Sequence, residues 1–169
     1  CLSKVQLPKL DEYQDYTFLV LHFPLFNKEA RITIPSQVTI LVGADYVVTV
    51  HQGNLRPLTK LLRDCQQSEE MRHQYMDHSS GHLLYPILDG LVDYCFPILN
   101  RIIQKVDAVE ERVFEGSARE TVRELSVLRR DIISYGRIIR PRIDVLELLE
   151  EKEFPFLKVD PDGYFGDLA

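Results

Sequence analysis

The stretch that decides the fold is residues 83–115, which read LLYPILDGLVDYCFPILNRIIQKVDAVEERVFE. Apolar residues recur in it at steps of three or four, a spacing that keeps them on one face of a helix. The stripe consists of Leu84, Leu88, Leu91, Cys95, Ile98, Ile102, Val106, Val109 and Val113. Pro97 lies within it, and we expect a kink there because proline lacks an N–H and crowds the preceding turn.

A second long helix is expected after Gly116, since Ser117 followed by Glu120 is a capping-box pattern. Residues 83–115 hold six acidic and three basic side chains, whereas residues 119–142 hold three acidic and seven basic. Opposite charges on consecutive helices favour an antiparallel hairpin, with the arginines on its solvated face. The expected apolar face of the second helix carries Val122, Leu125, Leu128, Ile132, Ile139, Ile143 and Leu146, with a bend at Pro141.

The first third of the chain has the composition of β-strands. Its β-branched and aromatic runs fall at residues 16–23, 31–34, 38–42 and 46–50. Pro24 is expected to end the first run because it cannot donate to a ladder. A helix at 55–66 and a loop or solvated helix at 68–81 follow. We therefore expect an α+β fold, in which an antiparallel or mixed sheet flanked by helices carries a long two-helix hairpin.

The length and charge of the chain argue against a nucleic-acid-binding protein and against a membrane-spanning helix in these residues. The chain has 169 residues and a formal net charge of −6. That length suits one domain, or one domain with an appendage, and the acidic excess argues against a nucleic-acid partner. The longest stretch without Asp, Glu, Lys or Arg is 32–44. This is shorter than the ~20 apolar residues of a membrane-spanning helix.

Neither the cysteines nor any short motif in the sequence indicates an enzyme. Cys1, Cys65 and Cys95 are odd in number and widely spaced, which favours reduced thiols over a disulfide framework or a zinc knuckle. Cys95 lies in the apolar stripe and is expected to be buried and inert. Neither GxSxG, HExxH nor a glycine-rich phosphate loop occurs in the sequence. Because the chain opens with Cys1 and not Met, we expect a piece of a longer protein.

Several local strings, in this order, resemble the CorA family of divalent-cation transporters. They are PKLDEY at 8–13, the hairpin at 38–50, LLYPILDGLVD at 83–93, the returning helix at 120–141 and YFGD at 164–167. The resemblance implies a sheet-containing part at 1–82, the helical hairpin at 83–153, and a turn with the start of a stalk helix at 154–169. The family's acidic helix before the first strand, its Gly-Met-Asn pore motif and its two transmembrane helices are absent from these residues.

The resemblance also implies a function. The chain would be most of the cytosolic regulatory domain of a magnesium and cobalt transport protein, at the cytoplasmic face of the cell membrane. Its parent would be a homo-oligomer, a pentamer, that meets the membrane only through the missing helices. Divalent cations, Mg²⁺ or Co²⁺, bound at acidic subunit interfaces would favour the closed channel. A zinc-transporting relative and a soluble helical-hairpin scaffold are the alternatives.

Asp89 and Asp167 are the metal ligands that the resemblance implies. Mg²⁺ prefers oxygen ligands and keeps several waters, so one or two carboxylates per partner suffice. Asp89 lies between Leu88 and Leu91, at the edge of the apolar stripe, where it is either a ligand or a solvated carboxylate. Asp93 follows one turn later, so it could share a cation with Asp89 or pair with a base on the returning helix.

Histidines offer a second, softer kind of metal ligand. His78 and His82 are four residues apart, as are His73 and Asp77. On a helix either pair could bind Co²⁺ or Zn²⁺. Because this segment is polar, an adventitious surface site is the interpretation we favour for it.

Overall fold

The computed structural model describes residues 6–115, 118–152, 154, 165–166 and 168. Its four strands form one antiparallel sheet in the order β1-β2-β3-β4, so every strand pairs with its neighbour in sequence. The strands are β1 (Lys9–Glu12), β2 (Tyr16–Asn27), β3 (Ile32–Gly43) and β4 (Val47–His51). Among the described residues, five helices follow them: α1 (Arg56–Gln67), α2 (Glu69–Met76), α3 (Ser80–Asp93), α4 (Cys95–Glu115) and α5 (Ala118–Glu151). The expected α+β fold with a long helical hairpin is confirmed.

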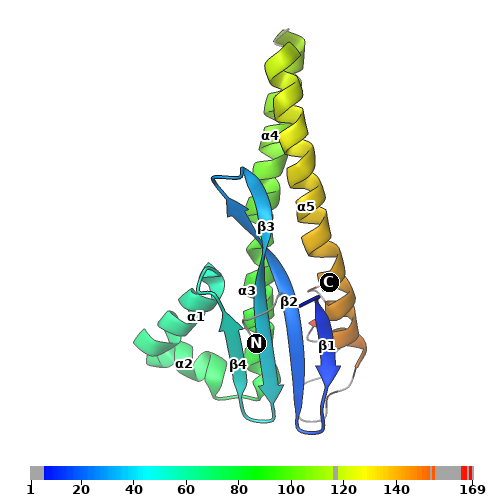
Figure 1. Cartoon of the computed structure of the whole chain (residues 1–169). Coiled ribbons are helices and arrows are strands. Elements are labelled where there is room, and N and C mark those ends of the chain that lie inside the picture. Colours follow the sequence, from blue (N-terminus) through cyan, green and yellow to red (C-terminus); the bar gives the residue numbers. More distant parts are fainter. Residues whose placement is uncertain (1–5, 116–117, 153, 155–164, 167, 169) are drawn as a thin grey trace.

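Strands β2 and β3 form a long hairpin that reaches beyond the rest of the sheet (Figure 1). The expectation that Pro24 ends its strand is wrong, and the two strands expected at 31–34 and 38–42 are one. Pro24 lies opposite Pro35 in the register. Because β1 pairs only with residues 17–20 and β4 only with 38–42, both prolines lie at open edges. A strand can pass through proline where it has no outer neighbour to bond.

Residues 68–81 are mostly helical, which settles the choice between a loop and a solvated helix. Helix α2 has no buried residue. Serine side chains cap both helices of this corner. The Ser68 hydroxyl accepts the N–H of Met71 at 3.3 Å at the start of α2, and the Ser79 hydroxyl accepts that of His82 at 3.3 Å at the start of α3. Each serine leaves the first turn of a helix with fewer unsatisfied N–H groups. Polar caps, and not buried apolar residues, therefore determine where α2 and α3 begin.

The expected single helix at 83–115 is two helices with a break at Tyr94. The interruption expected from Pro97 is present as this break, which lies in the turn before the proline. Pro97 is the third residue of α4, and the hydrogen bond that it cannot donate would have ended at Asp93, the last residue of α3. The apolar stripe itself is confirmed, since its members from Leu84 to Val109 are buried or half-buried, while Val113 is 55% exposed.

The face of α5 that packs matches the expected one only in part, and Ile139 and Ile143 of the expected face are half-buried. Val122, Leu125 and Ile132 are exposed, whereas Leu128 and Leu146 are buried as expected. The helix also continues through Pro141, and the capping Ser117 lies outside the described residues. The buried face carries the polar residues Thr121, Asp131 and Arg142 beside the apolar residues Leu128, Ile138, Val145 and Leu149. Apolar spacing alone cannot find a face on which an aspartate and an arginine are buried with partners.

The main core lies between the sheet, α3 and the end of α5. Alternate residues of β2, such as Leu19, Leu21 and Phe23, meet Leu88 of α3 and Leu149 of α5 in it. A smaller cluster of Ile102, Val109 and Leu128 joins α4 to α5, which project together beyond the sheet (Figure 1). Within the described residues, none of the helices combines the length and the apolar character that a bilayer crossing requires.

Candidate divalent-cation site

A groove of about 800 Å³ runs between α1, α2 and α3. Helix α1 crosses α3 at Gly90, where an added Cβ would lie 3.6 Å from the Cβ of Pro57. This crossing leaves the acidic edge of α3 facing the polar side of α1. The charged residues that line the groove are the bases Arg56, Lys60 and Arg63 and the acids Asp64, Asp89 and Asp93.

The structure brings Asp89 and Asp93 into this groove from consecutive turns of α3. Asp89 is half-buried because its neighbours Leu88 and Leu91 are fully buried in the core. Asp93 is exposed, and no ion pair joins it to a base of α5 in the part of the chain that is described. Both carboxylates are therefore accessible from one space.

These carboxylates do not complete a metal site by themselves. Among the described residues, no three side chains of the His, Cys, Asp and Glu types are placed to hold one ion. Mg²⁺ tolerates this, because it dehydrates reluctantly and is commonly held by one or two carboxylates. The groove can supply such a carboxylate pair, while water or another molecule must supply the remaining ligands.

Asp167 lies outside the described residues. Its neighbour Phe165 is 1% exposed and packs beside Tyr85, with ring centroids 6.5 Å apart. Tyr85 precedes Asp89 by one turn of α3. Phe165 therefore packs on the helix that carries the first expected ligand.

The histidines fall into three settings. His78 and His82 lie side by side at the α2–α3 corner, with ring centroids 4.4 Å apart. His73 forms an ion pair with Asp77, and this hydrogen-bonded carboxylate raises the pKa of the imidazole. His22 and His51 belong to strands, and burial lowers the pKa of each ring.

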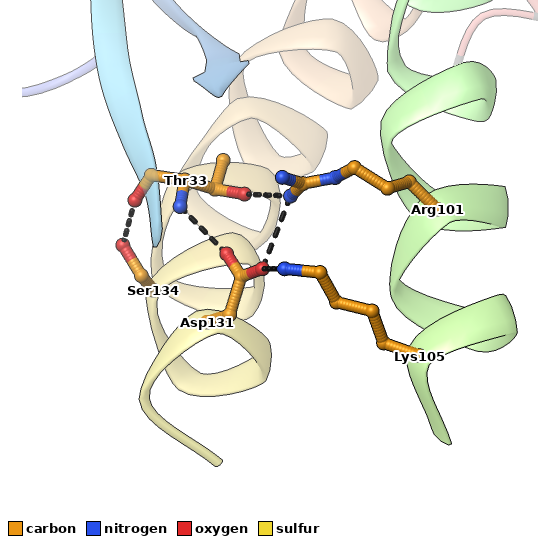
Figure 2. A network of polar contacts seen from close by, with 5 residues as sticks. All are labelled: Thr33, Arg101, Lys105, Asp131 and Ser134. Atoms are coloured by element: carbon orange, nitrogen blue, oxygen red, sulfur yellow. Dashed lines mark hydrogen bonds and ion pairs between the residues drawn. The ribbon is translucent and has the colours of Figure 1, made fainter. Parts of the chain in front are cut away.

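Sequence reasoning missed a buried polar network between the helical hairpin and β3 (Figure 2). Asp131 of α5 is fully buried; its Oδ2 lies 3.0 Å from Arg101 Nη2 and 3.7 Å from Lys105 Nζ of α4. Its Oδ1 accepts the N–H of Thr33 at 2.6 Å, and the Ser134 hydroxyl donates to the Thr33 carbonyl at 2.5 Å. The network therefore ties α4 and α5 to the β2–β3 hairpin.

The charged groups of this network are partly or fully buried and therefore partly desolvated. Arg101 stacks on Phe26 with its guanidinium carbon 3.2 Å from the ring centre. Burial lowers the pKa of Arg101, and burial together with the neighbouring guanidinium lowers that of Lys105, while Asp131 opposes both shifts. A signal for the network was present, since Asp131 is three residues from Leu128, and Arg101 and Lys105 share a face of α4.

A second buried polar contact lies where α4 begins. Arg142 of α5 is 6% exposed, and its Nη1 donates to the Cys95 sulfur at 2.9 Å. Burial raises the pKa of the Cys95 thiol although Arg142 opposes the shift, so the thiol stays neutral. Cys95 is therefore buried as expected and packs against Arg142.

The chain matches proteins of one family along its whole length. The family model described as CorA-like Mg²⁺ transporter protein matches residues 1–169. The putative metal ion transporter YfjQ of Bacillus subtilis is 29% identical over 168 residues, which are 99% of this chain and 50% of that protein. The cobalt/magnesium transport protein CorA of Thermotoga maritima is 26% identical over 99% of this chain and 47% of its own length.

A solved structure shares the fold. The soluble domain of CorA from Methanocaldococcus jannaschii superimposes with a TM-score of 0.79 at 21% identity, covering 96% of this chain and 63% of that one. The chain spans about half the length of the curated relatives it matches. With the family model matched from the first residue to the last, this chain belongs to the CorA-like Mg²⁺ transporter family.

Proposed function

We propose that this chain is the cytosolic metal-sensing domain of a CorA-like magnesium and cobalt transport protein. Its parent is a homo-oligomer, a pentamer, whose membrane helices lie outside this stretch of the polypeptide. Cations bound between subunits offset the repulsion of facing carboxylates and shift the population toward the closed channel. When the cation leaves, the subunits separate and the channel opens. The domain itself does not catalyse a reaction.

The half-buried position of Asp89 in the groove is the observation that carries this proposal. A carboxylate at the edge of a packed core keeps a fixed position, and it loses part of its hydration before any ion arrives. Asp93 adds a second oxygen ligand one turn away on the same helix. Because the described residues hold no set of three such ligands, the site suits a hydrated Mg²⁺ that a second subunit completes.

Asp167 is the second ligand in this proposal. The packing of Phe165 beside Tyr85 supports it, because Phe165 is two positions before Asp167 in the sequence and packs on the helix that carries Asp89. The bases Arg56, Lys60 and Arg63 on the opposite wall of the groove weaken cation binding through repulsion. We therefore expect weak binding, suited to a sensor that empties when the cation concentration falls.

Limited proteolysis of the full-length protein in detergent tests the proposal. We expect ~10 mM Mg²⁺, a concentration chosen for weak carboxylate sites, to protect the domain from trypsin relative to EDTA. Co²⁺ should protect as well, since carboxylate oxygens also bind it. Equal cleavage with Mg²⁺ and with EDTA would contradict the sensing role. Protection by Zn²⁺ alone would favour the zinc-transporting alternative.

A further inference from the structure

The corner between α2 and α3 places two imidazoles next to each other outside the acidic groove. Helix α2 ends at Met76, α3 begins at Ser80, and His78 lies in the short connection between them. The ring of His78 is 4.4 Å from that of His82, with 62° between the ring planes. The Ser79 hydroxyl accepts the N–H of His82, so the cap holds the backbone that carries both rings.

We propose that His78 and His82 form a bidentate site for a borderline divalent cation such as Zn²⁺, Ni²⁺ or Co²⁺. These ions accept imidazole nitrogen at about 2.0–2.1 Å, whereas Mg²⁺ requires oxygen. Two imidazoles on one such ion have ring centres roughly 4.5–5 Å apart, close to the observed spacing. The His78 side chain is exposed, so its ring has room to rotate toward a shared ion. Waters fill the remaining positions.

The local charges balance in favour of a cation at this corner. The C-terminus of α2 carries negative partial charge, and its C-cap residue Asp77 adds a carboxylate beside His78. The N-terminus of α3 opposes the ion through its positive end, but the Ser79 side chain satisfies one of its N–H groups. The site therefore has an electrostatic setting different from the groove, where three bases face the carboxylates.

The neighbouring His73 provides a matched control, because its ring nitrogens are already engaged. Its Nδ1 contacts the Asp77 carboxylate, and its Nε2 lies 3.6 Å from Glu69. These carboxylates favour a protonated ring, which has no free lone pair for a metal. His73 and His78 are both exposed and close in sequence, yet only His78 faces a second imidazole.

Zn²⁺ titration of the 169-residue chain by calorimetry tests the proposal. A Cys1→Ser background removes a competing thiol near the start of the chain, and ~10 mM Mg²⁺ occupies weak carboxylate sites. We expect one Zn²⁺ per chain, with His78→Ala and His82→Ala each weakening the affinity at least tenfold. His73→Ala should bind as the parent does, and circular dichroism of each variant should match it.

Two results would overturn this site. One is a parent chain that binds Zn²⁺ no more tightly than the His78→Ala/His82→Ala double variant, which would mean adventitious binding only. The other is a loss of Zn²⁺ affinity in His73→Ala as large as that in His78→Ala. Removing any exposed histidine would then weaken Zn²⁺ binding equally, and no specific site would be needed. Neither result bears on the carboxylate groove, since its test uses Mg²⁺ and different residues.

Discussion

Asp131 Oδ1 accepts the backbone N–H of Thr33 at 2.6 Å, although 98 positions separate the two residues in sequence. The bond joins the middle of α5 to the start of β3 and fixes the helical hairpin against the sheet. The second carboxylate oxygen holds Arg101 of α4 at 3.0 Å. One fully buried aspartate therefore determines how three distant elements meet.

Loss of the Asp131 charge should destabilise the whole domain. Asp131→Asn keeps the shape but leaves the cations of Arg101 and Lys105 without their buried counter-charge. We expect the free energy of unfolding to fall by about 2–4 kcal/mol, below the largest losses for buried pairs because both bases remain partly solvated. Urea denaturation measures this. Asp107→Asn on exposed α4 surface should change stability by no more than ~0.5 kcal/mol, and an equal loss in both variants would refute the assignment.

Two leucines one turn apart on α5 test which face of the helix is buried. Leu128 is 6% exposed in the hairpin cluster, whereas Leu125 is 44% exposed. Leu128→Ala should cost about 2–4 kcal/mol, since it removes buried methyl groups and leaves a cavity. Leu125→Ala should cost less than ~1 kcal/mol, because most of what it removes is solvated. Thermal unfolding of the two variants at equal concentration makes the comparison, and equal losses would favour the face expected from apolar spacing, which includes both leucines.

Burial of His22 should make stability depend on pH below 6.5. Burial lowers its pKa from 6.5, and within the described residues its Nε2 has no hydrogen-bond partner. Between the folded pKa and 6.5 the unfolded chain binds more protons, so stability rises with pH, with a slope of at most about 1.4 kcal/mol per pH unit for one group. The stability that the neutral His22 ring contributes is therefore lost as the pH falls from 6.5 toward the folded pKa.

Urea midpoints between about pH 5 and 7.5 measure this dependence. His22→Gln should flatten the fall in stability below pH 6.5 relative to the parent chain. His73→Gln is the control of opposite sign, because its raised pKa gives stability that is present below 6.5 and is lost as the pH rises through the folded pKa. Parallel profiles for the parent and His22→Gln would show that this ring does not govern the dependence.

Local patterns in the sequence predicted most of the elements, but not strand β1, the full length of β2 and β3, or all of the contacts between elements. The stripe from Leu84 to Val109 predicts a buried helical face, because a helical period survives even where the helix breaks at Tyr94. The face of α5 could not be found in this way. Its buried positions include Asp131 and Arg142, whose partners come from distant segments.

The candidate site shows the same division. The position of Asp89 at the edge of the stripe was readable from its buried neighbours Leu88 and Leu91. The groove beside it was not, because it depends on where α1 crosses α3 at Gly90 and Pro57, a tertiary contact with no periodic signature. Spacing could suggest the pair of His78 and His82, but only the α2–α3 corner shows that their rings are neighbours.

The role of Asp89 as a cation ligand is tested most directly by the Mg²⁺ midpoint for protection of the full-length protein from trypsin. For Asp89→Asn we expect a midpoint at least about fivefold higher than for the parent, equivalent to ~1 kcal/mol of lost cation binding. Asp107→Asn, an exposed carboxylate on α4 outside the groove, should leave the midpoint unchanged. An Asp89→Asn protein with the parent's midpoint would contradict Mg²⁺ sensing at this groove.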